Sequence, residues 1–169
     1  MRKMKLAVVI AISAVAAISL TPGSLLADDR EGLIGTWKLL EAVNEDLSTH
    51  EKTDIYKAGA VGLITYGADG RMMAIVVSSG RKKPGGDVAT APEAEALFRT
   101  MTAYAGSYTI EGGQIIHHVD ASWNEAWTGT DQVRDYKLDG GRLILATTPS
   151  PNPFTGKMSV RRLVWEKLK

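Results

Sequence analysis

The sequence contains no cysteine. This absence excludes disulfide bonds, thiol catalysis and cysteine-ligated metals, so packing alone must hold the fold together. The chain also lacks an excess of either charge, because 20 Lys and Arg residues face 19 Asp and Glu residues. Nucleic acids and anionic membranes attract strongly basic surfaces, and this composition offers none. We therefore expect no nucleic-acid partner.

Several catalytic motifs are absent as well. The chain has no G-x-S-x-G elbow, no phosphate-binding glycine loop and no H-E-x-x-H. Histidine is scarce, and two of the three histidines, His117 and His118, are adjacent. Neighbouring strand residues point to opposite faces, so these two cannot ligate one ion. We assign no catalytic residue, no metal and no cofactor.

The chain has a single long apolar run, from Leu6 to Leu20, preceded by the basic segment Met1–Lys5. With the small residue Ala27 further on, this pattern predicts a secretory signal peptide. The run is shorter than the roughly 20 residues of a membrane span, although a retained anchor is the alternative. We expect cleavage after Ala27, export to the periplasm or beyond, and one domain over residues 28–169. Without the leader's three basic residues, the formal charge of this domain is −2, from 17 Lys and Arg and 19 Asp and Glu.

After the leader, short β-rich segments alternate with glycine turns, as in Gly67–Gly70 and Asp139–Gly141. Eight strands in series, mostly joined by such turns, favour an antiparallel meander closed into an up-and-down barrel. A two-sheet sandwich is the alternative, but it needs longer connections. A barrel of about eight strands holds one small ligand or fills itself with side chains. The expected strands are 33–43, 61–66, 71–78, 106–111, 114–120, 132–138, 142–148 and 158–168.

One helix is expected between the third and fourth strands. Thr90 and Glu93 have the spacing of a capping box, and Glu95–Tyr104 continues with apolar residues on one helical face. The preceding segment, residues 79–89, is rich in Gly, Pro and Lys and predicts a mobile loop. Helix and loop together are expected either to cover the barrel as a lid or to cap its end.

The segment Gly35-Thr36-Trp37 resembles the G-x-W opening of lipocalins. Taken in order, the motifs resemble the bacterial and fungal lipocalin-like domain family over Leu33–Leu168. The resemblance implies an eight-stranded calyx, and it implies no settled activity. The other motifs are Gly62 with Tyr66 and Asp69-Gly70-Arg71-Met72, Tyr104-x-Gly106-x-Tyr108, His117-His118-Val119, Trp127-x-Gly129-Thr130-x-Gln132-Val133-Arg134 and Leu163-Val164-Trp165-Glu166.

Strand alternation separates the two adjacent histidines. His117 shares a face with Ile115 and Val119, which predicts that it points into the barrel while His118 points outward. Three roles remain open for His117: a hydrogen-bonded core residue, a ligand contact, or a general acid or base.

In the next strand, Arg134 alternates with the same parity as Tyr136 and is expected to face inward. A buried guanidinium needs hydrogen bonds or a partner, so it either braces the barrel or recognises a carboxylate or other polar ligand group. Arg161 and Arg162 in the last strand leave a similar choice. One of them is expected to pack over Trp37 and close the base of the barrel.

Two tryptophans, Trp123 and Trp127, lie in the loop between the fifth and sixth strands. Exposed indoles leave much apolar surface in water, so these side chains either plug the end of the core or line a ligand entrance. Tyr108 is expected to face inward. The candidate ligand contacts are His117, Arg134, Tyr136, Trp123, Trp127, Tyr108 and Tyr104.

The function that these features favour is binding of a small, mainly apolar molecule inside the barrel. A competing class is an isomerase, cyclase or hydratase in which His117 moves a proton and Arg134 holds a developing oxyanion. A third class is a packed envelope protein without a ligand, acting through contacts with partners.

Overall fold

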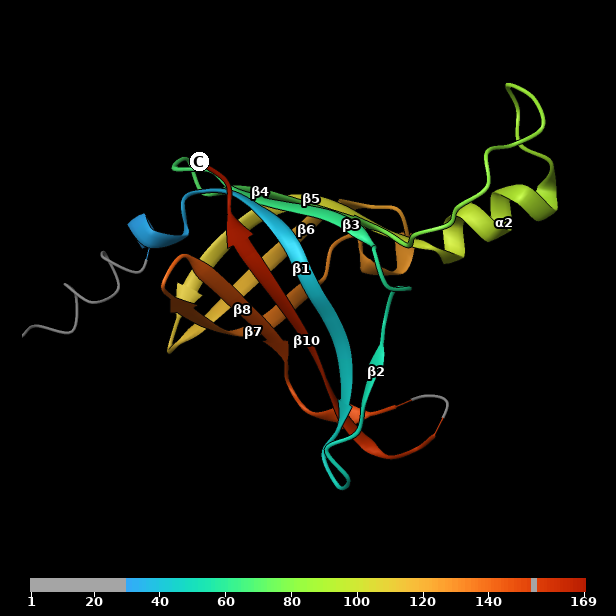
Figure 1. Ribbon diagram of the computed structural model, residues 1–169. Coiled ribbons are helices and arrows are strands. Elements are labelled where there is room, and N and C mark those ends of the chain that lie inside the picture. Colours follow the sequence, from blue (N-terminus) through green and yellow to red (C-terminus); the bar gives the residue numbers. More distant parts are fainter. Residues whose placement is uncertain (1–29, 153–154) are drawn as a thin grey trace, which may run out of the picture.

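The computed structural model describes residues 30–152 and 155–169 (Figure 1). The expected leader and its cleavage after Ala27 lie outside the described residues. No helix in the described part of the chain has the length and apolarity of a membrane span.

Eight long strands form a closed antiparallel barrel in which sequence neighbours pair in order, and β1 pairs with β10 to close it (Figure 1). The all-β, up-and-down barrel expected from the glycine turns is therefore confirmed. The long strands are β1 (Gly35–Asp46), β3 (Val61–Tyr66), β4 (Arg71–Val77), β5 (Met101–Glu111), β6 (Gln114–Ser122), β7 (Asp131–Asp139), β8 (Arg142–Thr147) and β10 (Met158–Lys167).

Two short strands were not expected. β2 (Lys52–Asp54) pairs with β1, and β9 (Ser150–Pro151) pairs with β10. Both are fully exposed, so neither carries the alternating apolar pattern by which a half-buried strand is recognised in a sequence.

The helix α2 (Ala91–Arg99) lies between β4 and β5. We expected it between the third and fourth strands; the additional strand β2 changes the count. The expected extension of this helix to Tyr104 is wrong, because Met101 pairs with Val77 and Tyr104 with Ala74 in the sheet. The apolar spacing that suggested a helical face belongs instead to the start of β5.

The helix α2 does not lie across the barrel as a lid or cap, although Phe98 and Arg99 at its end line the cavity described below. It has no buried residue and projects away from the barrel together with the preceding loop (Figure 1). Its start matches the sequence pattern, since the backbone N–H of Thr90 donates to Glu93 Oε2 at 2.8 Å.

One end of the barrel is filled by apolar side chains. Leu33, in a helical turn before β1, is fully buried, and its carbonyl accepts a hydrogen bond from Trp37 Nε1 at 2.8 Å. Trp37 and Trp165 are each only 1% exposed. Over the Trp37 ring lies Lys167, with Nζ 5.2 Å from the ring centroid. The expectation that Arg161 or Arg162 covers Trp37 is therefore wrong.

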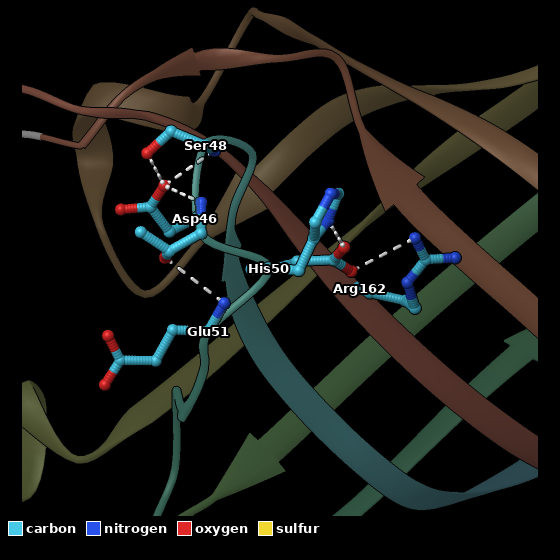
Figure 2. Close-up of polar contacts among 7 residues, drawn as sticks. Asp46, Ser48, His50, Glu51 and Arg162 are labelled. Carbon is cyan, nitrogen blue, oxygen red and sulfur yellow. Dashed lines mark hydrogen bonds and ion pairs between the residues drawn. The ribbon is translucent and has the colours of Figure 1, made fainter.

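At the other end, the turn after β1 is organised by one carboxylate (Figure 2). Asp46 accepts hydrogen bonds from Ser48 Oγ at 2.6 Å, Ser48 N at 2.8 Å and Thr49 N at 3.2 Å. Lys157 adds an ion pair at 3.1 Å. The hydrogen bonds from Ser48 hold the pKa of Asp46 well below its usual range.

The third histidine of the chain belongs to the same turn. His50 has a positive φ of 58°, and its Nδ1 lies 3.3 Å from Glu45 Oε1 (Figure 2). The second oxygen of Glu45 pairs with Arg162 at 3.4 Å. His50 thus belongs to an exterior turn, and the side chain of Arg162 on β10 makes its ion pair with Glu45 outside the barrel interior.

Gly106 marks a bulge at which the register between β5 and β6 shifts. It is buried, and a Cβ added there would collide with the backbone carbonyl of His118 on the facing strand. Since that obstacle is backbone, rotation of a side chain cannot relieve the contact. The close approach of the two strands therefore requires glycine at this position.

We expect Gly106→Ala to lower the free energy of unfolding by about 3 kcal/mol, because β5 and β6 must separate locally. Chemical denaturation followed by circular dichroism measures the change. Gly86→Ala is the matched control, since a Cβ there meets no atom within 4 Å. Equal stability of the two variants would contradict this account of the bulge.

Candidate functional site

The barrel end opposite Leu33 contains a cavity of about 580 Å³. Apolar side chains from several strands form much of its wall: Ile55, Ile64, Ala74, Val76, Leu145, Leu163 and Trp165. Polar groups are fewer and include Thr102, Gln132, Thr147 and three arginines, Arg99, Arg134 and Arg161. The indole Nε1 of Trp165 is buried and has no hydrogen-bond partner among the described residues.

Aromatic rings gather at one side of the cavity. Trp123 and Trp127 both line it, with ring centroids 5.0 Å apart in an edge-to-face arrangement. Trp127 also contacts Tyr104 at 5.6 Å, and Phe98 of α2 lies 6.2 Å from Trp123. The loop is shaped by the short helix η1 (Glu125–Trp127), at whose start Asn124 Oδ1 accepts from the N–H of Ala126 at 3.2 Å. Both tryptophans are half-buried and line an opening.

His117 points into the filled part of the barrel next to this cavity and is not one of its lining residues. It is fully buried, with Nε2 2.8 Å from the hydroxyl of Tyr66 and Nδ1 3.0 Å from that of Tyr104. Burial lowers the pKa of His117 to about 3, and the positive charge of Arg134 acts in the same direction. The neutral ring has one donor and one acceptor, and each has a partner.

The predicted separation of the two histidines is confirmed. Ile115, His117 and Val119 are buried, whereas His118 lies on the outer face. There His118 Nδ1 is 2.7 Å from Asp131 Oδ1, and Nε2 is 3.1 Å from Thr109 Oγ1.

Arg134 faces inward, as strand parity predicts, and lines the cavity. Nη1 donates to the carbonyl of Val133 at 2.8 Å, and Nη2 donates to Gln132 Oε1 at 3.2 Å. Burial lowers the pKa of Arg134, and the charge of Arg161 lowers it further. Both oxygens that receive its hydrogen bonds are uncharged.

The three tyrosines proposed from the sequence lie at different depths. Tyr104 lines the cavity, and burial raises its pKa to about 12. Tyr108 is buried below the cavity, where its hydroxyl donates to the carbonyl of Gly67 at 3.0 Å. Tyr136 is half-buried and packs against the core. Four of the seven candidate residues therefore line the cavity, namely Arg134, Tyr104, Trp123 and Trp127.

Several cavity residues were not proposed as candidates, Tyr56 and Arg161 among them. Tyr56 follows β2 in a segment that the sequence indicates is a polar connection, and its hydroxyl donates to Thr102 Oγ1 at 2.7 Å. For Arg161 the sequence left a choice, because either Arg161 or Arg162 was expected over Trp37 at the opposite end of the barrel. Arg161 shares strand parity with Leu163 and Trp165, which also line the cavity, so the alternation in β10 carried the signal.

A metal centre has no support from the described residues. Nowhere among them do three or more His, Cys, Asp or Glu side chains gather in a way that could hold a metal ion.

The buried histidine predicts a specific pH dependence. Unfolded histidine takes up a proton near pH 6.5, whereas folded His117 does so only near pH 3. Its contribution to stability is therefore complete above pH 6.5 and is lost as the pH falls from 6.5 towards 3, by at most about 1.4 kcal/mol per pH unit.

His117→Gln should make the free energy of unfolding less dependent on pH between 6.5 and 4, although the variant is less stable at neutral pH. Urea denaturation at a series of pH values measures both slopes. An unchanged slope in His117→Gln would show that this residue is not the buried neutral group.

Comparison with known proteins agrees with the geometry. A family model described as a lipocalin-like domain matches residues 34–168, which is most of the chain. A search of curated proteins finds no match. The matched range spans every barrel strand and all four candidate residues that line the cavity. The chain belongs to the lipocalin-like domain family.

Proposed function

We propose that this protein is exported and binds a small, mainly apolar molecule in the open end of its barrel. The observation that carries the proposal is the cavity of about 580 Å³ between the apolar wall and the two loop tryptophans. Small-molecule sites have volumes of roughly 300–1,000 Å³ and are lined mainly by apolar and aromatic groups with a few polar atoms. The cavity has this size, and most of its described lining residues are apolar or aromatic, alongside eight polar ones.

The lining explains how such a molecule gains affinity. Each methylene group removed from water contributes roughly 0.8 kcal/mol, so an apolar body against Val76, Leu145 and Leu163 supplies most of the binding energy. Trp123 and Trp127 provide rigid apolar surface at the opening.

The ionisable groups of the cavity support binding over proton-transfer catalysis. Tyr56, Tyr104 and three arginines line it, with neither histidine nor carboxylate among the described lining residues. Burial raises the pKa of Tyr56 and Tyr104, so both hydroxyls keep their protons near neutral pH. The isomerase, cyclase or hydratase alternative would have to move a proton to His117 through Tyr104. The alternative of a packed protein without a ligand predicts a barrel filled by side chains, and the cavity does not favour it.

Filling the cavity tests the proposal. The neutral dye N-phenyl-1-naphthylamine fluoresces in apolar surroundings and should bind the wild type. Ala74 is buried and lines the cavity, so we expect Ala74→Phe to weaken dye binding by roughly tenfold or more. Ile75→Phe is the matched control, because Ile75 is 42% exposed. Equal dye affinity in both variants would place the dye outside the cavity. The proposed binding function would then require that native mass spectrometry of protein purified from the periplasm shows a co-purifying molecule.

Export is the second part of the proposal, and it rests on the basic and apolar segments of residues 1–20 and on Ala27. When the full chain is expressed in a Gram-negative host, the periplasmic fraction should contain protein whose N-terminal residue is Asp28. Edman degradation or intact mass identifies this terminus. Full-length protein retained in the membrane fraction would instead support an uncleaved anchor.

A further inference from the structure

Two arginines project from the inner wall of the barrel at the same level. Arg134 on β7 is directly opposite Thr147 on β8, and the backbone N–H of Arg161 on β10 donates to Thr147 Oγ1 at 3.1 Å. Neighbouring strands lie about 4.8 Å apart, so the two arginines begin roughly 10 Å apart on strands separated by β8. All three residues line the cavity. Thr147 therefore lies between the two cationic residues Arg134 and Arg161 on the inner wall of the cavity.

In the part of the chain that the structure describes, no carboxylate inside the cavity neutralises these two cations. The described residues that line it include no Asp or Glu. Among the described residues, Arg134 donates to uncharged oxygens only, those of Val133 and Gln132. Asp54 lines a neighbouring cavity together with Arg161, but the two form no ion pair among those that the described residues make.

Arg99, the third arginine of the cavity, differs from Arg134 and Arg161 because it has an ion-pair partner. Arg99 Nε lies 2.8 Å from Glu95 Oε1 one helical turn earlier, and its side chain is largely exposed to solvent. Its charge is therefore compensated within α2 and screened by water. Arg134 has neither advantage, because it is largely buried and the nearby charge of Arg161 has the same sign. Burying a cation beside another cation is unfavourable unless an anion joins them.

We propose that the ligand is an organic anion: an apolar molecule whose carboxylate lies between Arg134 and Arg161. This inference rests on the proposed function and names the chemistry of the ligand. The guanidinium groups donate to the carboxylate oxygens, and the hydroxyl of Thr147 is placed between them. The apolar body extends deeper, against Leu145, Leu163 and Trp165.

The position of the two arginines along the strands determines this orientation. On β8, Leu145 precedes Thr147 towards the filled end of the barrel, and on β10 Leu163 and Trp165 follow Arg161 in the same direction. Arg161 is exposed, so the carboxylate at this level keeps part of its hydration. The opposite orientation would bury the charge among apolar side chains, which costs far more.

Two alkyl ligands of equal length test the anion preference. Dodecanoate and dodecanol displace N-phenyl-1-naphthylamine from the wild type, at a pH where the acid is ionised. We expect dodecanoate to bind roughly tenfold more tightly than dodecanol, since charge-assisted hydrogen bonds are the stronger class. Salt should reduce this difference, because Arg161 lies where solvent ions screen it.

Arg161→Gln and Arg134→Gln should each remove most of the preference for dodecanoate and leave the affinity for dodecanol within about twofold of the wild type. Arg162→Gln is the matched control. It is the next residue on β10, and its side chain pairs with Glu45 on the exterior. This variant should keep the full preference. Arg161 is exposed and its side chain has no hydrogen bond among the described residues, so Arg161→Gln decides the question even if Arg134→Gln does not fold.

The outcomes separate the two proposals. Equal binding of dodecanoate and dodecanol by the wild type overturns the anion assignment and leaves the binding function standing. A preference for dodecanoate that survives in Arg161→Gln also overturns the anion assignment. An equal loss of affinity for dodecanoate and dodecanol in the arginine variants overturns it as well, because the arginines would then only brace the barrel. If neither the dye nor either alkyl ligand binds the wild type, the proposed function itself fails.

Discussion

The pairing of β1 with β10 is the constraint on which the rest of the structure depends. It runs from Trp37 opposite Lys167 to Asp46 opposite Ser159 and turns an open meander into a closed barrel. A chain without cysteine has no covalent alternative, so backbone hydrogen bonds and the packing of the inner faces must stabilise the molecule together. Closure also creates an interior, and each inward side chain must then either fill it or surround an empty part. At one end Leu33, Trp37 and Trp165 fill it, and towards the opposite end the cavity begins.

The buried polar groups also differ between the filled end and the cavity end of the barrel. His117 lies in the filled region, where both ring nitrogens have tyrosine partners and the pKa is lowered because the charged form would be desolvated. It is a completed network, which adds specificity to packing without requiring a ligand. Arg134 and Trp165 both line the cavity. The indole Nε1 of Trp165 has no hydrogen-bond partner among the described residues, and Arg134 donates to uncharged oxygens and lies near the like charge of Arg161. Of the two buried side-chain donors without a partner among the described residues, Trp165 Nε1 belongs to a residue that lines the cavity, and Arg81 Nε lies in the loop before α2.

Strand parity and glycine turns were enough to predict the barrel, the inward position of His117 and Arg134, and the outward position of His118. They were not enough to predict depth. Parity assigns a side chain to the interior, but whether that interior is filled or open depends on side chains that are distant in sequence, such as Leu33. His117 was for this reason grouped with the ligand contacts although it does not line the cavity, and the choice between Arg161 and Arg162 as the residue over Trp37 was left open although neither lies there. The end of α2 was missed because the spacing of Met101 and Tyr104 suits either a helix or a strand, and only pairing with β4 decides between them.

The asymmetry between the two ends explains how one barrel can be both stable and open. Folding energy comes mainly from the filled end, where indole, leucine and tyrosine side chains are almost completely buried. The open end can then retain groups that are unfavourable for folding, including a buried guanidinium beside another cation, because the rest of the core offsets their cost. A ligand carboxylate between Arg134 and Arg161 would remove that cost in the bound state alone. Affinity for an anion would thus arise partly from relief of repulsion that closure of the barrel imposes on the free protein.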